Sequence, residues 1–152
     1  MNSTFCKAVI GLFLAGTSRS ADLSSSGDWV TGATASNLIS GAGSDFQGQF
    51  ESLAGVTTLT IFNAPGAWSL RARRGGSQWS GDVKVLVRRA SGGSGIGSVS
   101  GGTGYVELTT TDAEIFSGSG ARSGISLQFK LAGVSKRVSP ATYLSTILFT
   151  VQ

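Results

Sequence analysis

The chain has 152 residues, only 13% of which are charged, and its formal net charge is +4. It contains no histidine and a single cysteine, which excludes the common Ser-His-Asp and Cys-His catalytic arrangements and removes the usual ligand of zinc and copper. The length predicts one domain with a buried core. Low charge together with many Gly, Ser, Thr and Val residues predicts an all-β protein rather than one with long helices.

Residues 1–20 have the form of a secretory signal peptide. Lys7 precedes the apolar stretch 8–15, and the small residues Ser18 and Ser20 suit cleavage after Ser20. This apolar stretch is too short for a membrane-spanning helix, which needs about 20 residues. The alternative is an ordinary amino-terminal strand. We expect a secreted, extracellular or cell-surface protein without a transmembrane anchor.

Cleavage would change the chemistry of the chain in two ways. It would remove Cys6, the one cysteine, so the released chain could form no disulfide. It would also take Lys7 and Arg19 from the twelve basic residues and leave a net charge of +2. The sequence pI of about 9.7 therefore overstates the case for a nucleic-acid partner.

Residues 21–45 are polar and rich in Gly and Ser, and we expect a flexible segment there. Such a segment can add as a strand to the open sheet edge of another subunit, with backbone hydrogen bonds for affinity and alternate side chains in pockets. The alternative is that this segment contains only the first strand of the chain's own domain, preceded by a flexible leader. The candidate donor residues share one two-residue register and are Trp29, Thr31, Ala33, Ala35 and Ile39.

Residues 46–152 alternate apolar and polar side chains as half-buried strands do. About seven to nine short strands separated by turn signals are typical of a single antiparallel β-sandwich. No internal repeat or change of composition marks a second domain. The predicted strands cover residues 56–62, 67–74, 82–89, 105–110, 113–118, 125–131 and 141–152.

A glycine-rich tract occupies residues 88–108, "RRASGGSGIGSVSGGTGYVEL". Its spacing matches neither the dinucleotide-binding pattern nor the P-loop, and both of these need a helix to begin at the loop. A strand-like run follows instead. Strands of the same character flank the tract, so we expect a mobile surface loop within one domain rather than a linker.

Basic residues fall on the polar side of two predicted strands. If these strands share a sheet, they form a positive patch that could bind acidic polysaccharide or extracellular DNA. A solvated outer face is the alternative. This second hypothesis, a monomeric secreted binding module for polysaccharide or polyanion, uses Arg71, Arg73, Lys84 and Arg88 with Trp79 in the connecting loop.

Acidic residues give little support to enzyme activity. Asp112 and Glu114 lie two residues apart, with Glu107 upstream, and charges on a strand edge are usually solvated. Paired catalytic carboxylates come from separate strands that face a cleft. We expect no catalytic residues, no metal site and no cofactor.

The end of the chain, "SPATYLSTILFTVQ", resembles the closing strand of secreted bacterial fimbrial and spore-coat-U-like subunits, and "ISLQFKLAGVS" resembles the strand before it. The resemblance covers the stretch from residue 125 to the end. It implies an immunoglobulin-like sandwich that is exported and polymerised with copies of itself, by strands donated between subunits, into a fibre, pilus or surface coat. The residues that carry it are Pro140, Ala141, Thr142, Tyr143, Thr146, Ile147, Thr150 and Val151.

Overall fold

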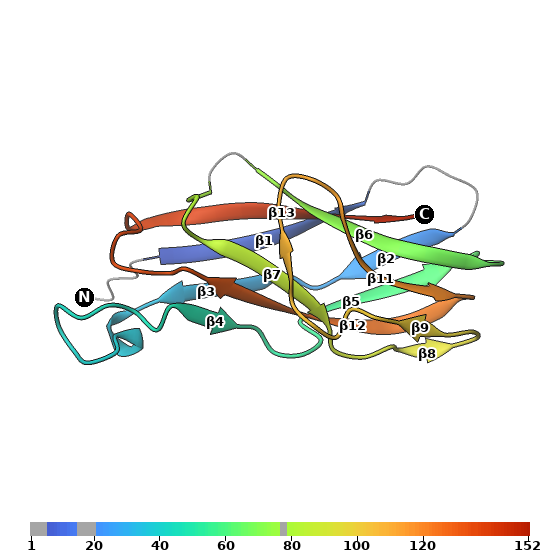
Figure 1. Ribbon diagram of the computed structural model, residues 1–152, viewed down its shortest axis with the longest axis horizontal. Coiled ribbons are helices and arrows are strands. Elements are labelled where there is room, and N and C mark those ends of the chain that lie inside the picture. The colour runs from blue at the N-terminus through green and yellow to red at the C-terminus, as the bar shows by residue number, and fades with distance from the viewer. Residues whose placement is uncertain (1–5, 15–20, 77–78) are drawn as a thin grey trace.

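The computed structural model describes residues 6–14, 21–76 and 79–152, the first range by its backbone (Figure 1). Within these ranges the protein consists of strands in two sheets, apart from a 3-10 turn, η1, at Ala35–Asn37. The prediction of an all-β, sandwich-like fold is confirmed at this level.

The six-stranded sheet contains both the first and the last strand of the described chain. β1 (Cys6–Leu14) and β13 (Ala141–Val151) lie side by side and run parallel, blue beside red in Figure 1. The other neighbours in this sheet run antiparallel. The full order is β3 (Trp29–Ala33), β1, β13, β6 (Ala67–Gly75), β11 (Ala113–Ser119) and β9 (Val99–Ser100).

The seven-stranded sheet is antiparallel and is organised around β12 (Arg122–Ala132). The first half of β12 pairs with β5 and β8, and its second half pairs with β7 and β4. The described residues form more strands than the seven to nine predicted, because segments of two or three residues also pair. The other strands of this sheet are β10 (Val106–Leu108), β7 (Lys84–Arg89), β5 (Thr57–Phe62), β2 (Asp22–Ser26), β4 (Gln49–Glu51) and β8 (Ser94–Gly95).

The core lies between the two sheets and uses the inward positions that the alternation predicts. On β12 the side chains of Ile125, Leu127 and Phe129 are buried, while Lys130 remains partly exposed. Burial of each such large apolar side chain contributes roughly 1.5–3 kcal/mol. The same alternation places in the core Leu59 and Ile61 of β5, Trp68, Leu70 and Ala72 of β6, Val85 and Val87 of β7, and Ile147, Phe149 and Val151 of β13.

The glycine tract is packed tightly against β11 and β12, which follow each other in the chain but lie in different sheets, in place of the mobile surface loop that the sequence predicts. β8 pairs with the start of β12, and β9 pairs with β11. A Cβ atom at Gly95 would meet the carbonyl oxygen of Ala121, and one at Gly97 would meet that of Ser119. Glycine is therefore needed here because two backbones approach too closely for any side chain.

Arg122 at the start of β12 fastens this tract. Its guanidinium donates five hydrogen bonds of 2.9–3.2 Å to the carbonyl oxygens of Gly92, Gly93, Gly95 and Gly97. A phosphate-binding loop presents backbone N–H groups to its ligand. Here the carbonyl oxygens converge instead, so the tract has the polarity that suits a cation, and the cation is the side chain of Arg122.

Two glycine substitutions test whether this close approach stabilises the fold. Gly97 (φ +88°) and Gly101 (φ +78°) share a left-handed backbone, but a Cβ atom meets nothing within 4 Å at Gly101. Both Gly→Ala changes cost roughly 1 kcal/mol through the backbone. We expect Gly97→Ala to lower the free energy of unfolding by roughly 2–3 kcal/mol more than Gly101→Ala, measured by urea titration of tryptophan fluorescence. Equal losses in the two variants would contradict the tight packing.

Candidate functional site

The predicted donor residues belong to the sandwich of their own chain. Three of them lie on β3 and two lie beyond it: Trp29, Thr31 and Ala33, then Ala35 and Ile39. Trp29 is buried and stacks on Phe129, with ring centroids 6.4 Å apart, whereas Ile39 is 66% exposed. β2, which precedes β3, pairs with β5. Donation of this segment to another subunit requires that it leave these contacts, so the donor role stays a prediction.

β1 fills an interior position of the six-stranded sheet, although it lies within the residues that the sequence predicts to be a signal peptide. Its first residue, Cys6, pairs with Ala33 of β3 on one side and with Ala141 of β13 on the other. Among the described strands, β3 pairs with β1 alone in this sheet. The predicted cleavage after Ser20 lies outside the described residues.

Removal of β1 would leave an opening one strand wide, which we call the β3–β13 slot. Neighbouring strands lie about 4.8 Å apart, so the slot would measure about 9–10 Å between the backbones of residues 29–33 and 141–145, and β13 alone would line it from there to residue 149. In this second part, β13 contributes Ile147 and Phe149 on the core side, both fully buried. An unpaired backbone group next to such a core costs roughly 1–3 kcal/mol. The slot therefore favours any strand that can pair with both walls.

A cavity of about 480 Å³ lies at the end of the sandwich where β1 begins. One wall comes from the segment that follows β3, and the other comes from the segment that precedes β13. These segments adjoin Ala33 and Ala141, the two partners of Cys6. We call it the end cavity, and its apolar lining is Ala35, Leu38, Phe46, Val134, Val138 and Pro140.

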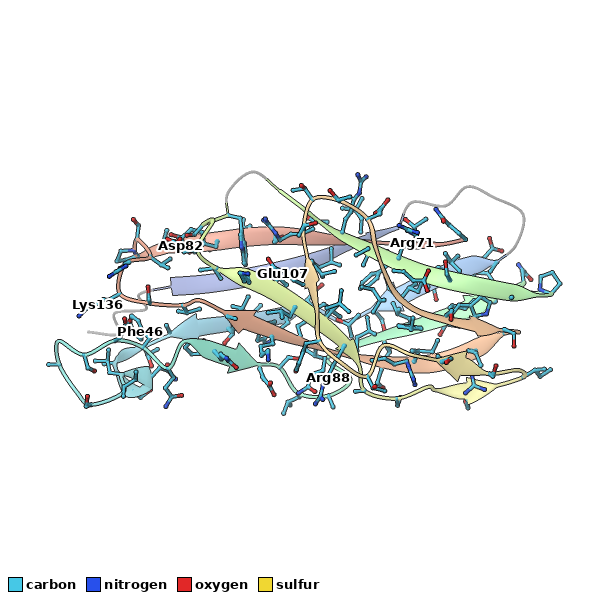
Figure 2. The ribbon with its side chains drawn as sticks, viewed as in Figure 1. Phe46, Arg71, Asp82, Arg88, Glu107 and Lys136 are labelled. Carbon is cyan, nitrogen blue, oxygen red and sulfur yellow. The ribbon has the colours of Figure 1, made fainter. Side chains whose placement is uncertain are left out.

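Asp45 holds the two walls of the end cavity together. Its Oδ1 atom accepts hydrogen bonds from the backbone N–H of Lys136 (2.8 Å) and of Phe46 (2.9 Å). Figure 2 shows Phe46 and Lys136 at the same end of the molecule. The two amides, Lys136 first, lower the pKa of Asp45 below its usual range, because they favour the ionised carboxylate.

The predicted basic patch does not exist as one face, because its strands belong to different sheets. Arg71 and Arg73 lie on β6 in the six-stranded sheet, whereas Lys84 and Arg88 lie on β7 in the seven-stranded sheet. Figure 2 labels Arg71 and Arg88, which lie well apart. The alternation of each strand shows which side is polar but not which sheet the strand joins. The chain therefore carries two separate pairs of basic residues.

Contacts within the protein engage these basic side chains. Arg71 donates to the carbonyl oxygen of Asp112 at 3.2 Å, and Arg73 lies 3.7 Å from the carboxylate of Asp112. Lys84 forms a 2.9 Å ion pair with Glu107. These pairs are exposed and contribute at most about 1 kcal/mol each.

Arg88 belongs to a denser cluster on the outer face of the seven-stranded sheet. It donates two hydrogen bonds, of 2.9 and 2.7 Å, to Oε1 of Gln128. Its guanidinium also lies 4.9 Å from the ring centroid of Tyr105, and the ammonium of Lys130 lies 4.2 Å from the same centroid. Burial raises the pKa of the Tyr105 phenol above its usual value. The cluster fixes the end of the glycine tract to the sheet.

Trp79 is packed into the sandwich edge rather than displayed for sugar stacking. Its Nε1 atom donates to the carbonyl oxygen of Val83 at 2.6 Å. Its ring meets the ring of Tyr143 edge-on, at 6.2 Å between centroids, and the guanidinium of Arg74 lies 5.3 Å from its centroid. These contacts indicate a structural role.

Sequence reasoning missed Asp45, Tyr105 and Arg122. None of them carries a local signal, because each acts on backbone or side chains distant in the sequence. The residues that the structure describes contain no group of three or more His, Cys, Asp or Glu side chains placed to hold a metal ion.

No family model and no curated protein matches this sequence. In the described part of the chain, no helix is long and apolar enough to cross a membrane.

The role of Asp45 predicts a pH-dependent stability difference. The lowered pKa means that the folded state favours the carboxylate, so the stabilisation is complete above the ordinary pKa of about 4 and is lost as the pH falls through the lowered folded-state value. We expect Asp45→Asn to be less stable than the parent near pH 6 and indistinguishable from it near about pH 2, by urea unfolding. Asp28→Asn, at an exposed position, is the control. A difference that persists in acid would contradict the assignment.

Proposed function

We propose that this protein is a secreted structural subunit of an extracellular fibre, pilus or surface coat, and that it joins its neighbours by β-strand addition. The observation that carries the proposal is the position of β1, an interior strand that lies within the predicted signal peptide. Loss of that segment would open the β3–β13 slot. Extended peptides bind such sites through main-chain hydrogen bonds, with alternate side chains giving specificity.

We also propose that the sandwich is immunoglobulin-like. Two features support this. The consecutive strands β2 and β3 lie in different sheets, so the chain crosses from one sheet to the other at residues 27–28. In addition, the hydroxyl of Tyr143, near the start of β13, donates to the carbonyl oxygen of Ser139 at 2.7 Å. A tyrosine that bonds back to the upstream backbone is a feature of immunoglobulin-like domains.

The chemistry of the slot suits a strand better than a small molecule. Its walls are two extended backbones, and β13 alone would present nine residues, 141–149, in need of partners. The inward side chains Ile147 and Phe149 favour apolar residues at every second position of an occupant. The binding-module hypothesis has less support, since the basic residues are divided between two sheets and engaged within the chain.

The proposal is tested with the full chain, folded with β1 in place and then cut. A protease site is inserted between residues 15 and 20, and the purified protein is cleaved there. We expect the cut protein to exchange residues 6–14 for a fluorescent peptide of the same sequence, seen as a rise in anisotropy, whereas the uncut protein takes up none. Stripping the segment from the cut protein should lower the free energy of unfolding by roughly 3–5 kcal/mol.

A proline-substituted peptide separates strand addition from simple apolar adhesion. Ala8→Pro, Ile10→Pro and Leu12→Pro keep the peptide apolar but remove backbone N–H donors, so this peptide should not be taken up. A cut protein that loses residues 6–14 without loss of stability, and that binds neither peptide, would overturn the proposed function.

A further inference from the structure

We propose that the strand that fills the β3–β13 slot is donated by a different protein, and that an apolar side chain just ahead of that strand enters the end cavity. This inference rests on the proposed function and names the partner of its site. The chain would then receive a strand without donating one, which places it at the end of a fibre or at a single docking point.

A chain cleaved after Ser20 has no unpaired amino-terminal segment to donate. A chain cleaved after Ser20 begins one residue before β2 (Asp22–Ser26). β2 is paired along its whole length with β5, from Asp22 opposite Phe62 to Ser26 opposite Thr58. β3 follows at once, and Trp29 is only 7% exposed. No residue of such a chain is free ahead of its own sandwich, so donation would dismantle the donor.

The slot calls for an apolar occupant. The segment that fills the slot in this structure contains the continuous apolar run 8–14, "AVIGLFL". Residues 21–55 contain no comparable run, and their small or polar residues outnumber their large apolar ones. A second copy of the chain therefore offers no amino-terminal strand of matching apolarity. A different protein must supply it.

The end cavity lies on the path of the incoming strand. β1 runs parallel to β13 and antiparallel to β3, with Cys6 opposite Ala141 and Ala33. Extension of this register by one position brings an occupant level with Pro140 on one side, and extension by two positions brings it level with Ala35 on the other. Both residues line the end cavity. At about 3.3 Å per residue, the cavity begins within one or two residues of the slot.

The end cavity has the size and polarity to hold a large apolar side chain. An apolar cavity of about 150 Å³ is enough to hold benzene, so about 480 Å³ accommodates a large apolar side chain. The lining is mainly apolar, and the hydrogen bond that Asp45 accepts from the backbone N–H of Lys136 joins its two walls. The cavity thus favours the binding of a strand that carries Leu, Phe or a similar residue ahead of its paired region.

The test uses the cut full-length protein, stripped of residues 6–14, and two fluorescent peptides. Both contain residues 6–14, preceded in one case by Leu-Leu and in the other by Ser-Ser. We expect the Leu-Leu peptide to bind roughly ten- to a hundredfold more tightly. In the variant Ala35→Phe, which fills the cavity from the exposed η1 turn, this preference should disappear. Ala54→Phe, at an exposed turn in another part of the sequence, should keep it.

The same samples test whether the strand is donated by another copy of this chain or by a different protein. Light scattering and negative-stain images should show the stripped protein as a monomer, and a peptide of residues 21–39 should not compete with the labelled strand. Filaments formed by this protein alone, or competition by the 21–39 peptide, would overturn the proposal that a different protein donates the strand. Neither result would contradict strand addition itself. Equal affinities for the Leu-Leu and Ser-Ser peptides would overturn the role of the end cavity. Failure to bind any peptide would overturn the proposed function itself.

Discussion

The backbone of β13 needs a partner on each of its two sides, and the rest of the structure depends on this constraint. β6 pairs with one side and β1 with the other, while the inward side chains Ile147 and Phe149 are fully buried. Water cannot easily satisfy backbone groups that border such a core. Because one of the two partners comes from residues 6–14, the sandwich is complete only while some strand occupies that position.

The same strand connects several features that are distant in the sequence. β1 joins β3 to the rest of its sheet, and β3 carries Trp29, whose ring stacks on Phe129 of the opposite sheet. β3 also leads into the wall of the end cavity that Asp45 fastens to Lys136. Loss of β1 would weaken the attachment of β3, the stacking of Trp29 on Phe129 and the wall of the end cavity together, because cooperative units of structure open as contiguous segments. The free energy with which a strand binds at this site is therefore also a contribution to the stability of this edge of the sandwich.

The sequence predicted which side chains face the core much better than it predicted which strands are neighbours. Alternation identified Leu70 and Val85 as inward, since a two-residue period follows directly from strand geometry. It could not show that β6 and β7 belong to different sheets, because the period is the same in both. The glycine tract was predicted as a loop because strand-like segments flank it and no phosphate-binding motif fits, but its tight packing depends on Arg122, far along the chain. Residues 6–14 are ambiguous for a simpler reason: an apolar run suits a signal peptide and a buried strand equally well.

The outer edges of the two sheets are poorly suited to pairing with another chain. In the described part of the chain, the strands that pair with one neighbour only are short, with two residues each in β8 and β9, three each in β4 and β10, and five each in β2 and β3. Asp22, Ser24 and Ser26 on β2 are exposed and polar. Short, polar edges are a recognised protection against unwanted pairing between chains. β13, by contrast, spans eleven residues and would present its long apolar-sided edge only inside the slot. Under the proposed function, such a protein would admit an added strand at one interior position and resist it elsewhere, so that a sandwich rich in strands would form a specific assembly instead of an aggregate.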